Sequence, residues 1–450
     1  MSLFSKFRIS KPSADRIPEE EVDERYRTLR RRTFWGVTAA YVLYYVCRMT
    51  LGVVKQPIID GGILTAGQLG IIGSAFYFVY AAGKFCNGFI ADYCNIRRFM
   101  AVGIGISAIA NLVLGLAGLF QTWLGIGSIV MTVLFSLFWG INGWVQSMGS
   151  PPGVISLSRW YPLSRRGTMY SIFSSTPNLG KAVTMILTGF VVGAAGWQWG
   201  FLAAAVAGII GLVISLTMIT DTPESAGLPS VQEYYGEAPA PADSKPTREI
   251  QKWVIRHPGI WVIALSSAFI YITQHAVSDW GVLLLQKQKG FSLESATQII
   301  GISEVFGVVG TLLAGWLSDS VFRGNRVTPV IISGILSVAA LLGFLFLGGG
   351  FWTNILFVAV FALCFSVVFC VVAGLMALDF VPRKATGSAM GIVGISSYVA
   401  AGAQSILSGF LIEAGSTGGV YDFTPVAVFW TCSCLLAFVL PVILWRHLKK

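Results

Sequence analysis

The chain has 450 residues, of which 55% are hydrophobic and only 12% carry a charge. This composition is typical of a protein with many membrane-spanning segments and excludes an ordinary soluble domain. The formal net charge of +10 would suggest nucleic acid as the partner of a soluble chain. Here the cations lie in the first tail and in short loops, so membrane topology explains them. We therefore expect a lipid bilayer around the protein and no nucleic-acid partner.

The motifs of common enzymes are missing from the sequence. The seven cysteines are scattered through apolar segments, and an odd number without ligand spacing argues against a disulfide framework or a metal site. The sequence also contains no P-loop, no HExxH motif and no GxSxG motif. We therefore expect no catalytic residues, no metal, no cofactor and no ATP-driven pump.

Twelve windows of about 20 apolar residues are long enough to cross a bilayer. Six of them precede a polar stretch in the middle of the chain and six follow it, which predicts an all-α membrane protein. The predicted spans are 34–54, 69–91, 99–119, 125–150, 168–192, 198–220, 260–285, 296–317, 327–347, 353–378, 386–411 and 424–445.

The polar stretch at 221–257 is rich in Pro, Ala and charge, which indicates a linker. We divide the chain into a tail at 1–33, a six-helix bundle at 34–220, this linker, a second six-helix bundle at 258–446 and a C-terminal end at 447–450. Most of the 31 Lys and Arg residues then lie on the side of the termini, whereas the loops of the other side hold Lys55, Lys287 and Lys289. By the positive-inside rule, we expect both termini in the cytoplasm.

The two halves repeat the same short motif, a Gly-x-x-x-Asp sequence followed by two arginines, after the second and the eighth span. The residues are Gly88, Asp92, Arg97 and Arg98 in the first half and Gly315, Asp319, Arg323 and Arg326 in the second. Two copies of one six-helix unit in the same orientation predict a binding site between the halves near the midplane. We expect the aspartates and arginines of the motif to latch helices together at the cytoplasmic face.

The first span, FWGVTAAYVLYYVCRMTLGVV, carries an arginine several residues inside the membrane. Tyr41, Tyr44, Tyr45 and Arg48 follow one another at helical spacing, which places three phenols and a guanidinium on one face. A cation at a helix centre costs about 2.5 to 3.5 kcal/mol on insertion scales. A water-filled cavity with an anionic guest would offset this cost, and the alternative is an arginine that reaches the lipid headgroups.

These motifs resemble the major facilitator superfamily and, more narrowly, its organophosphate/phosphate antiporters. That family includes glycerol-3-phosphate and hexose-6-phosphate transporters and a related hexose-phosphate sensor. The resemblance runs from the tail to the last helix. It rests on YYVCR at 44–48, GWVQSMGSPPG at 143–153, SDW at 278–280, GWLSDSVFRGNR at 315–326 and DTPESAGLP in the linker.

The resemblance implies that Arg48 binds the phosphate of the substrate, and Lys84 and Glu304 match a lysine and a glutamate of the family. The chain departs from the family pattern in three places. Pro177 and Lys181 stand where a histidine and paired glycines are usual, Gln274 replaces a second phosphate-binding arginine, and VVF at 367–369 replaces Tyr-Gly-Pro. Two repairs are open: Lys181 supplies the missing charge, or the substrate or the coupling ion differs.

Each candidate also has a structural reading. Lys84 could extend to the cytoplasmic end, Glu304 could face water instead of balancing a cation, and His275 could be structural instead of coupling protons. The polar Gln146, with Asn142, and Tyr398 could bind sugar hydroxyls or hold helices together. The predicted substrate-binding residues are Arg48, Lys84, Lys181, Tyr41, Tyr44, Tyr45, Asn178, Gln146, Tyr271, Gln274, His275 and Tyr398, and the predicted coupling or gating residues are Glu304, Asp279, Asp92, Arg97, Asp319 and Arg323.

Together these features predict a monomeric multi-pass carrier of the bacterial inner membrane. We expect it to move a phosphorylated organic anion of the hexose 6-phosphate or glycerol 3-phosphate type in exchange for inorganic phosphate. Two alternatives stay open at this point. One is a transporter-like sensor of sugar phosphate that signals to a partner, and the other is a proton-coupled porter of a different organic anion.

Overall fold

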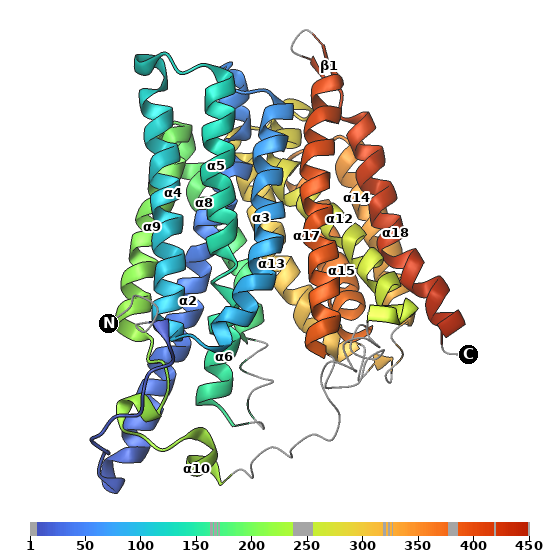
Figure 1. Cartoon of the computed structure of the whole chain (residues 1–450). Helices are drawn as coiled ribbons and strands as arrows, with labels where there is room; N and C mark the ends of the chain where they lie inside the picture. The colour runs from blue at the N-terminus through green and yellow to red at the C-terminus, as the bar shows by residue number, and fades with distance from the viewer. Residues whose placement is uncertain are drawn as a thin grey trace.

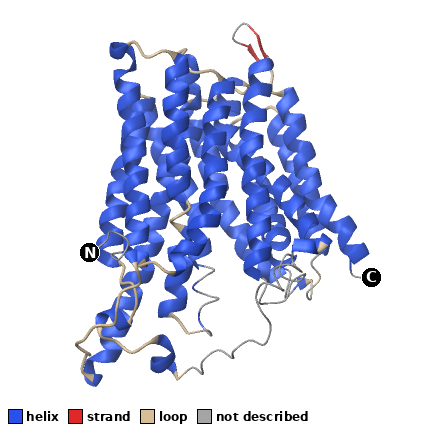
Figure 2. Cartoon of the chain, in the orientation of Figure 1, coloured by secondary structure: helices blue, strands red, loops and turns tan. Residues whose placement is uncertain are grey.

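The structure is a computed structural model, and it describes residues 7–162, 165, 169, 172–236, 255–317, 321–322, 325, 327–376, 386–417 and 420–448. The described chain is almost entirely helical (Figure 1, Figure 2). Twelve of its helices are long and apolar enough to cross a membrane, which confirms the predicted all-α membrane fold.

The helices of the first half run in chain order up to the middle of the sequence. They are α2 (Glu19–Asp60), α3 (Ala66–Asp92), α4 (Ile96–Leu124), α5 (Ser128–Gln146), α6 (Ser150–Trp160), α8 (Thr176–Ala195) and α9 (Trp197–Met218), followed by the short η1 (Glu224–Ala226) and α10 (Val231–Tyr235).

The second half is also helical and ends in a small hairpin and a last helix. Its elements are α12 (Pro258–Lys287), α13 (Leu293–Trp316), α14 (Val327–Phe346), α15 (Phe351–Phe369), η3 (Cys370–Met376), α17 (Thr386–Ala414), β1 (Ser416–Thr417), β2 (Val420–Tyr421) and α18 (Thr424–Leu448). The strands β1 and β2 pair antiparallel.

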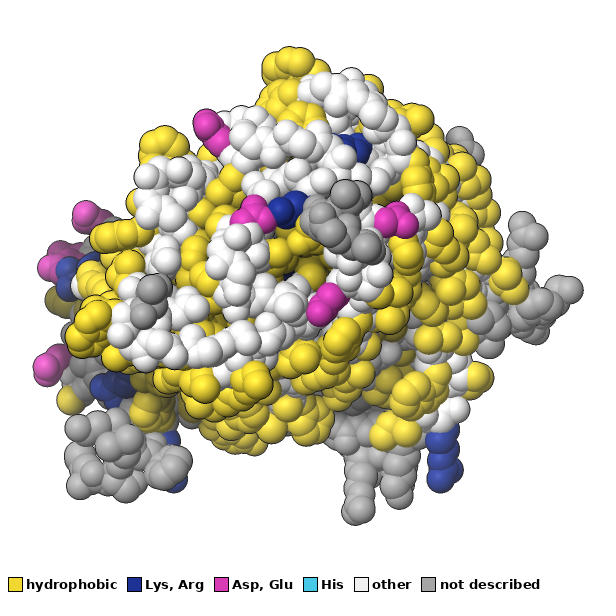
Figure 3. Space-filling model, turned by 90° about the horizontal axis from the view of Figure 1, so that it is seen from above, with side chains coloured by type: hydrophobic (Ala, Val, Ile, Leu, Met, Phe, Trp, Pro, Cys, Tyr) yellow, Lys and Arg dark blue, Asp and Glu magenta, His cyan; other side chains and the backbone are white. Residues whose placement is uncertain are grey.

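Each half packs mainly on itself, and three helix pairs join the two. In the first half α4 and α2 pack on α9, and α3 packs on α5; in the second, α13 packs on α15 and α14 on α18. Across the seam, α3 packs on α17, α8 on α13 and α2 on α12 (Figure 1). Hydrophobic side chains form the sides of the molecule, and a few charged ones stand on the loops of the top face (Figure 3).

Glycines of α3 and α17 bring the backbones of these two helices close together across the seam. A Cβ atom on Gly70 would lie 2.7 Å from the carbonyl oxygen of Ser405 and 3.3 Å from the Cα of Gly409. Small residues let two membrane helices approach until their backbones touch. These contacts hold the halves together toward the face opposite the termini, which we call the distal face.

Two polar contacts also join the halves at the distal face. Lys287 at the end of α12 forms an ion pair with Asp60 at the end of α2. Glu413 on α17 accepts hydrogen bonds from Thr65 Oγ1 (3.0 Å) and from the backbone nitrogen of Gly67 (2.7 Å) at the start of α3. The seam is therefore closed at this end by charge as well as by packing.

The polar segments before and after the first half are more ordered than a tail and a linker would be. Helix α2 already begins at Glu19, and part of the linker forms α10 against it. Tyr26 stacks on Tyr234 with ring centroids 4.1 Å apart, and the Tyr234 hydroxyl donates to Asp23 (2.6 Å). Aromatic packing that a polar composition does not reveal therefore fixes this part of the linker.

Two of the predicted spans are interrupted. The span predicted at 125–150 ends as α5 at Gln146, and after a turn α6 continues with Pro151 and Pro152 in its first turn, where a missing N–H is tolerated. The span predicted at 353–378 changes from α15 to the π-helix η3 at Cys370. Such π-helical turns are rare and often lie near functional sites.

Candidate functional site

Arg48 lies in an aromatic cage at the seam between the two halves. Its guanidinium carbon is 5.4, 5.1, 4.7 and 5.8 Å from the ring centroids of Tyr45, Phe76, Tyr80 and Tyr398. Arg48 is only 6% exposed, and its Nε has no hydrogen-bond partner. Among the described residues, no carboxylate forms an ion pair with it. A buried unpaired cation costs several kcal/mol, so the cage is suited to an anionic guest.

Lys84 on α3 also contacts a ring of this cage. Its side chain is exposed, and its Nζ lies 5.0 Å from the centroid of the Tyr398 ring, which Arg48 also contacts. The ring of Tyr398 is in turn 4.4 Å from Tyr80 and 5.0 Å from Tyr271. Tyr398 therefore contacts both cations and brings α17 against the first half.

The three tyrosines of the first span separate into two groups. Tyr45 contacts Arg48, and the ring of Tyr41 lies 5.4 Å from Tyr45 and 5.1 Å from Phe173. Tyr44 turns away from the cage, because its hydroxyl donates to the carbonyl oxygen of Met100 on α4 (2.7 Å). The sequence predicted all three phenols on one face of the helix. Because α2 packs against α4, Tyr44 instead points away from the cage.

Lys181 is paired across the seam with Glu304. The Nζ of Lys181 on α8 donates to Glu304 Oε2 on α13 at 3.1 Å, and Ser278 on α12 donates to the other carboxylate oxygen at 3.0 Å. Lys181 is 5% exposed and Glu304 9%. Each residue of the pair neutralises the charge of the other. An unpaired charge inside a membrane span is costly, so a partner is expected for a cation at the position of Lys181.

His275 and Asp279 on α12 are joined by a tyrosine of α3. The hydroxyl of Tyr77 lies 2.8 Å from His275 Nδ1 and donates to Asp279 Oδ2 at 2.7 Å. A hydroxyl has one proton, so when it donates to Asp279 it accepts from Nδ1–H of His275. All three side chains are buried. These hydrogen bonds cross the seam, and of the three residues only His275 and Asp279 were predicted from the sequence as site residues.

The loop position predicted for Lys55 is wrong. Lys55 was expected in an outward loop, but it lies inside α2, is 2% exposed, and has its Nζ 3.3 Å from the ring centroid of Trp280. It lines a small cavity of ≈ 20 Å³ together with Arg48, Tyr77 and Asp279. That volume is enough for about one water molecule. Lys55 thus adds a second buried basic side chain to the cavity that Arg48 lines.

Gln146 and Asn142 on α5 hold helices together. Gln146 Nε2 donates to the Tyr44 carbonyl oxygen (3.0 Å) and to Ser107 Oγ (2.9 Å), and Asn142 Nδ2 donates to the Cys47 carbonyl oxygen (3.0 Å). Both side chains are fully engaged with α2 and α4. Of the two readings open from the sequence, these bonds correspond to helix packing.

Three further candidates lie on helices that border the seam. Tyr271 is 5.7 Å from the ring of His275. Gln274 is half-buried on the same helix. Asn178 on α8 faces α13, because a Cβ on Gly307 would lie 3.5 Å from its Nδ2.

Of the residues predicted to latch the cytoplasmic face, Arg97 is described with its side chain, and it lines a different hollow from Arg48. Arg97 is exposed and lines a polar hollow beside Asp221 near the N-terminal segment. The side chain of Asp92 and the residues Asp319 and Arg323 lie outside the described part of the structure.

Comparison with known proteins shows which family the chain belongs to. The sequence profile of the Major Facilitator Superfamily matches residues 37–403. The chain belongs to the Major Facilitator Superfamily.

Two relatives in this superfamily match almost the whole chain. A "Probable hexose phosphate transport protein" of Chlamydia pneumoniae is 31% identical over 480 residues, which covers 100% of this chain and 99% of the relative. A "Glycerol-3-phosphate transporter" of Bacillus subtilis is 30% identical and covers 98% of this chain and 97% of its own length. The predicted family is thereby confirmed, and the chain is a transporter-type membrane protein, not an enzyme.

The fold agrees with solved structures of the superfamily. A bacterial homologue of the human lysosomal transporter Spinster, in an inward-facing and unoccupied conformation, superposes with a TM-score of 0.69 at 17% identity, covering 92% of this chain and 94% of that one. A similarity at this level of identity shows the fold alone.

Three members of the site in this Major Facilitator Superfamily chain were missed as site residues from the sequence: Lys55, Phe76 and Tyr77. Phe76 and Tyr77 precede Tyr80 and Lys84 on the second span by about one and two turns, so an aromatic face leading to a lysine was visible. Lys55 was missed because it follows the apolar run by only one residue, where a loop is the simplest reading. Only the length of α2, which continues to Asp60, places it inside the bundle.

Proposed function

We propose that the chain is a secondary transporter that carries a phosphorylated small organic anion, of the hexose 6-phosphate or glycerol 3-phosphate class, in exchange for inorganic phosphate. The observation that carries the proposal is Arg48, buried between the halves with an unpartnered Nε and no acidic partner among the described residues. The names of the two relatives support the substrate class.

The chemistry of the cage fits a phosphate group. A guanidinium offers a planar fork of donors that bind two phosphate oxygens, and such charge-assisted bonds are strong where water is scarce. Lys84 contacts the same Tyr398 ring as Arg48 and can add a second charge. The tyrosine hydroxyls around the cage offer bonds to the organic part of the substrate.

The pair of Lys181 and Glu304 suggests how binding drives the transport cycle. Without substrate, Glu304 neutralises Lys181 across the seam and ties α8 to α13. A phosphate that reaches Lys181 competes with Glu304, so the loaded and the empty carrier differ in what holds the halves together. A ligand shifts a two-state equilibrium only through such a difference, and exchange requires that the loaded carrier moves more readily than the empty one.

We place this monomeric carrier in the bacterial inner membrane with both termini in the cytoplasm. The strong excess of Lys and Arg on the side of the termini supports this orientation. The closed distal face then faces outward, and the substrate reaches Arg48 from the cytoplasm. The two bundles at 34–220 and 258–446 are the proposed rocking units, with the linker at 221–257 between them.

The test is exchange in reconstituted vesicles. Proteoliposomes loaded with inorganic phosphate are mixed with labelled hexose 6-phosphate or glycerol 3-phosphate, and uptake is compared with vesicles that contain no phosphate. We expect uptake that requires internal phosphate and does not respond to an imposed pH gradient. Binding without any counterflow would overturn the transport proposal.

The proton-coupled alternative draws on the chain of His275, Tyr77 and Asp279. These three buried groups are connected by hydrogen bonds and lie beside the Arg48 cavity. If they carry a coupling proton, uptake follows a pH gradient and ignores internal phosphate.

The sensor alternative draws on Gln274, which replaces a cation of the family. It predicts tight binding of sugar phosphate without counterflow.

A further inference from the structure

Two further hollows lie away from the Arg48 cavity. They are found where the N-terminal segment crosses the N-terminal end of α4. Residues 7–11 are fixed there by backbone bonds to the loop between α3 and α4: Ile9 N donates to Tyr93 O (3.2 Å), and Asn95 N donates to Phe7 O (2.8 Å). Ser10 N is held by the carboxylate of Asp221 at 2.8 Å. The segment therefore forms a fixed wall of both hollows.

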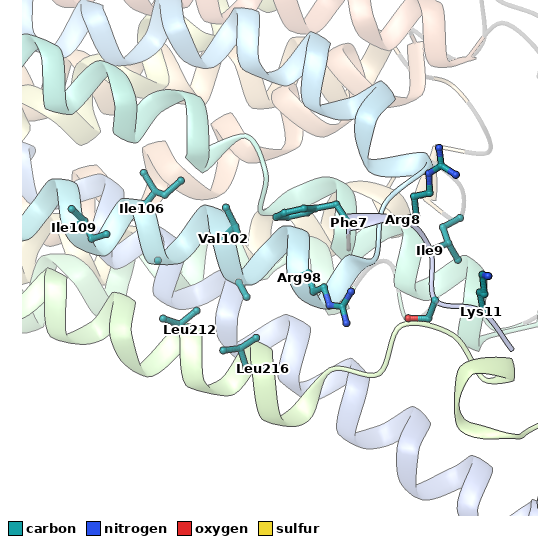
Figure 4. Close-up of a pocket in the computed structure, with 13 residues that line it drawn as sticks. Phe7, Arg8, Ile9, Lys11, Arg98, Val102, Ile106, Ile109, Leu212 and Leu216 are labelled. Carbon is teal, nitrogen blue, oxygen red and sulfur yellow. The ribbon is translucent and has the colours of Figure 1, made fainter. Parts of the chain in front are cut away.

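The larger hollow is an apolar groove of ≈ 1170 Å³ between α4 and α9. Val102, Ile106 and Ile109 form a row along α4, with Leu212 and Leu216 on α9 opposite them (Figure 4). Val102, Ile106 and Ile109 are exposed on the outside of the bundle. From Arg98 to Ile109 the groove follows α4 for about 16 Å, roughly half the thickness of the hydrocarbon core of a bilayer.

The smaller hollow is polar, has a volume of ≈ 480 Å³, and shares four lining residues with the groove: Ser10, Lys11, Arg98 and Leu216. Besides those four, its lining includes Asn95, Arg97, Thr220, Asp221 and Ser225. The groove thus opens at its polar end into a pocket with hydrogen-bonding groups on several sides.

The charge around these hollows is positive. Arg8, Lys11, Arg97 and Arg98 line one or both, and Figure 4 shows Arg98 at the end of the apolar row with Arg8 and Lys11 beyond it. The acid among the lining residues, Asp221, already binds Arg159 Nη1 (2.5 Å), Ser10 N (2.8 Å) and Ile96 N (2.9 Å). A ligand bound in these hollows would lie close to several positively charged side chains. The carboxylate of Asp221 is already neutralised by Arg159.

We propose that these hollows form a binding site for one anionic phospholipid. The phosphate headgroup occupies the polar pocket between Lys11, Arg97 and Arg98, and one acyl chain lies in the groove along α4. Basic pockets between membrane helices bind such headgroups, and a groove open to the bilayer with a cationic end matches both parts of a lipid. A soluble phosphate would leave the groove unfilled. The site is separate from Arg48 and does not depend on the transported substrate.

The test measures lipid retention on the full chain by native mass spectrometry. Dioleoyl phosphatidylglycerol is compared with dioleoyl phosphatidylcholine, which lacks net charge, and with dihexanoyl phosphatidylglycerol, whose chains are too short to fill the groove. We expect one dioleoyl phosphatidylglycerol per chain to be retained in preference to both. Retention of phosphatidylcholine to the same degree, or displacement by millimolar inorganic phosphate, would overturn the proposal.

Two variants separate the headgroup from the acyl chain. The double variant K11Q/R98Q should weaken phosphatidylglycerol binding on the order of 30-fold, from the usual contribution of two cations near an anionic headgroup. Gly105→Leu should weaken the dioleoyl lipid but not the dihexanoyl one. A Cβ on Gly105 would make ordinary contact with Leu212 at 3.7 Å, so the helix tolerates the change while the leucine fills the groove.

The matched control removes the same charge elsewhere. Arg16 and Arg25 are exposed and line neither hollow. The variant R16Q/R25Q should bind phosphatidylglycerol within twofold of the unchanged chain. All variants are first checked for a monodisperse elution profile. An equal loss of binding in R16Q/R25Q, or unchanged binding of the dioleoyl lipid in Gly105→Leu, would show that no specific site exists.

Discussion

At the scale of single residues, the site depends on how each buried charge is balanced. Lys181 is balanced by Glu304, and Asp279 accepts a hydrogen bond from the Tyr77 hydroxyl. Arg48 is surrounded by the faces of aromatic rings, which attract a cation but offer no full negative charge. An added anion would therefore gain the most stabilisation by accepting a hydrogen bond from this unpartnered Nε.

Arg48→Lys tests the need for a planar fork. Lysine keeps the charge but cannot bind two phosphate oxygens at once, so we expect uptake of labelled sugar phosphate to fall about 10- to 100-fold, the value of one strong charged hydrogen bond. Arg16→Lys, at an exposed position, is the control. Undiminished uptake by Arg48→Lys would remove this residue from the proposed binding site.

The ion pair between Lys181 and Glu304 can be tested by a double-mutant cycle. Lys181→Met or Glu304→Gln alone leaves a buried charge or polar group without its partner, which we expect to cost about 3 kcal/mol of unfolding free energy. The double variant should lose much less than the sum of the two, as denaturant unfolding can measure. Additive losses would mean that the two side chains are not coupled in the membrane.

At the scale of elements, we expect the close approach of α3 and α17 to control how the distal face closes. A Cβ on Gly409 would lie 2.6 Å from the Ala66 carbonyl oxygen and 3.1 Å from the Cα of Gly70, so backbone would have to move. Gly394 on the same helix has no atom within 4 Å of such a Cβ. The two glycines therefore offer a matched comparison within one helix.

Gly409→Val should separate α3 from α17 and favour a state that is open at the distal face. The readout is labelling of Ser405→Cys by a membrane-impermeant thiol reagent, after replacement of the exposed Cys86 and Cys432. Ser405 is buried and donates to the Gly70 carbonyl oxygen at 3.2 Å, so it is protected while the seam is closed. We expect faster labelling in Gly409→Val and no change in Gly394→Val. Equal rates in both would show that this packing does not control closure.

At the scale of the whole molecule, we expect the charged contacts at the distal face to bias the equilibrium between closed and open states. The ion pair of Asp60 and Lys287 is partly exposed, and exposed pairs contribute about 0.2 to 1 kcal/mol. Such an energy shifts a two-state population by a factor of roughly 1.4 to 5. That is enough to change the cycle without unfolding the protein.

A charge exchange tests this contact. Lys287→Asp places two acids together and should speed labelling of Ser405→Cys by a few fold, and the double variant D60K/K287D should return it toward the original rate. High salt should weaken the effect of the single variant, because exposed charges are screened. If the double variant labels as fast as Lys287→Asp alone, the contact plays no part in closure.

The sequence by itself determined the twelve spans and the family, and it predicted the repeat of the two halves, because long apolar windows and spaced motifs are local features that survive any packing. It also found Arg48, Lys181 and Glu304, since a charge inside an apolar run is expensive wherever the helix lies. Only the tertiary structure decided which charges meet. The pairing of Lys181 with Glu304, the link from His275 through Tyr77 to Asp279, and the burial of Lys55 all join helices distant in sequence. The rotation of each helix about its axis is set by its neighbours, as Tyr44 shows by turning from Arg48 to the backbone of α4.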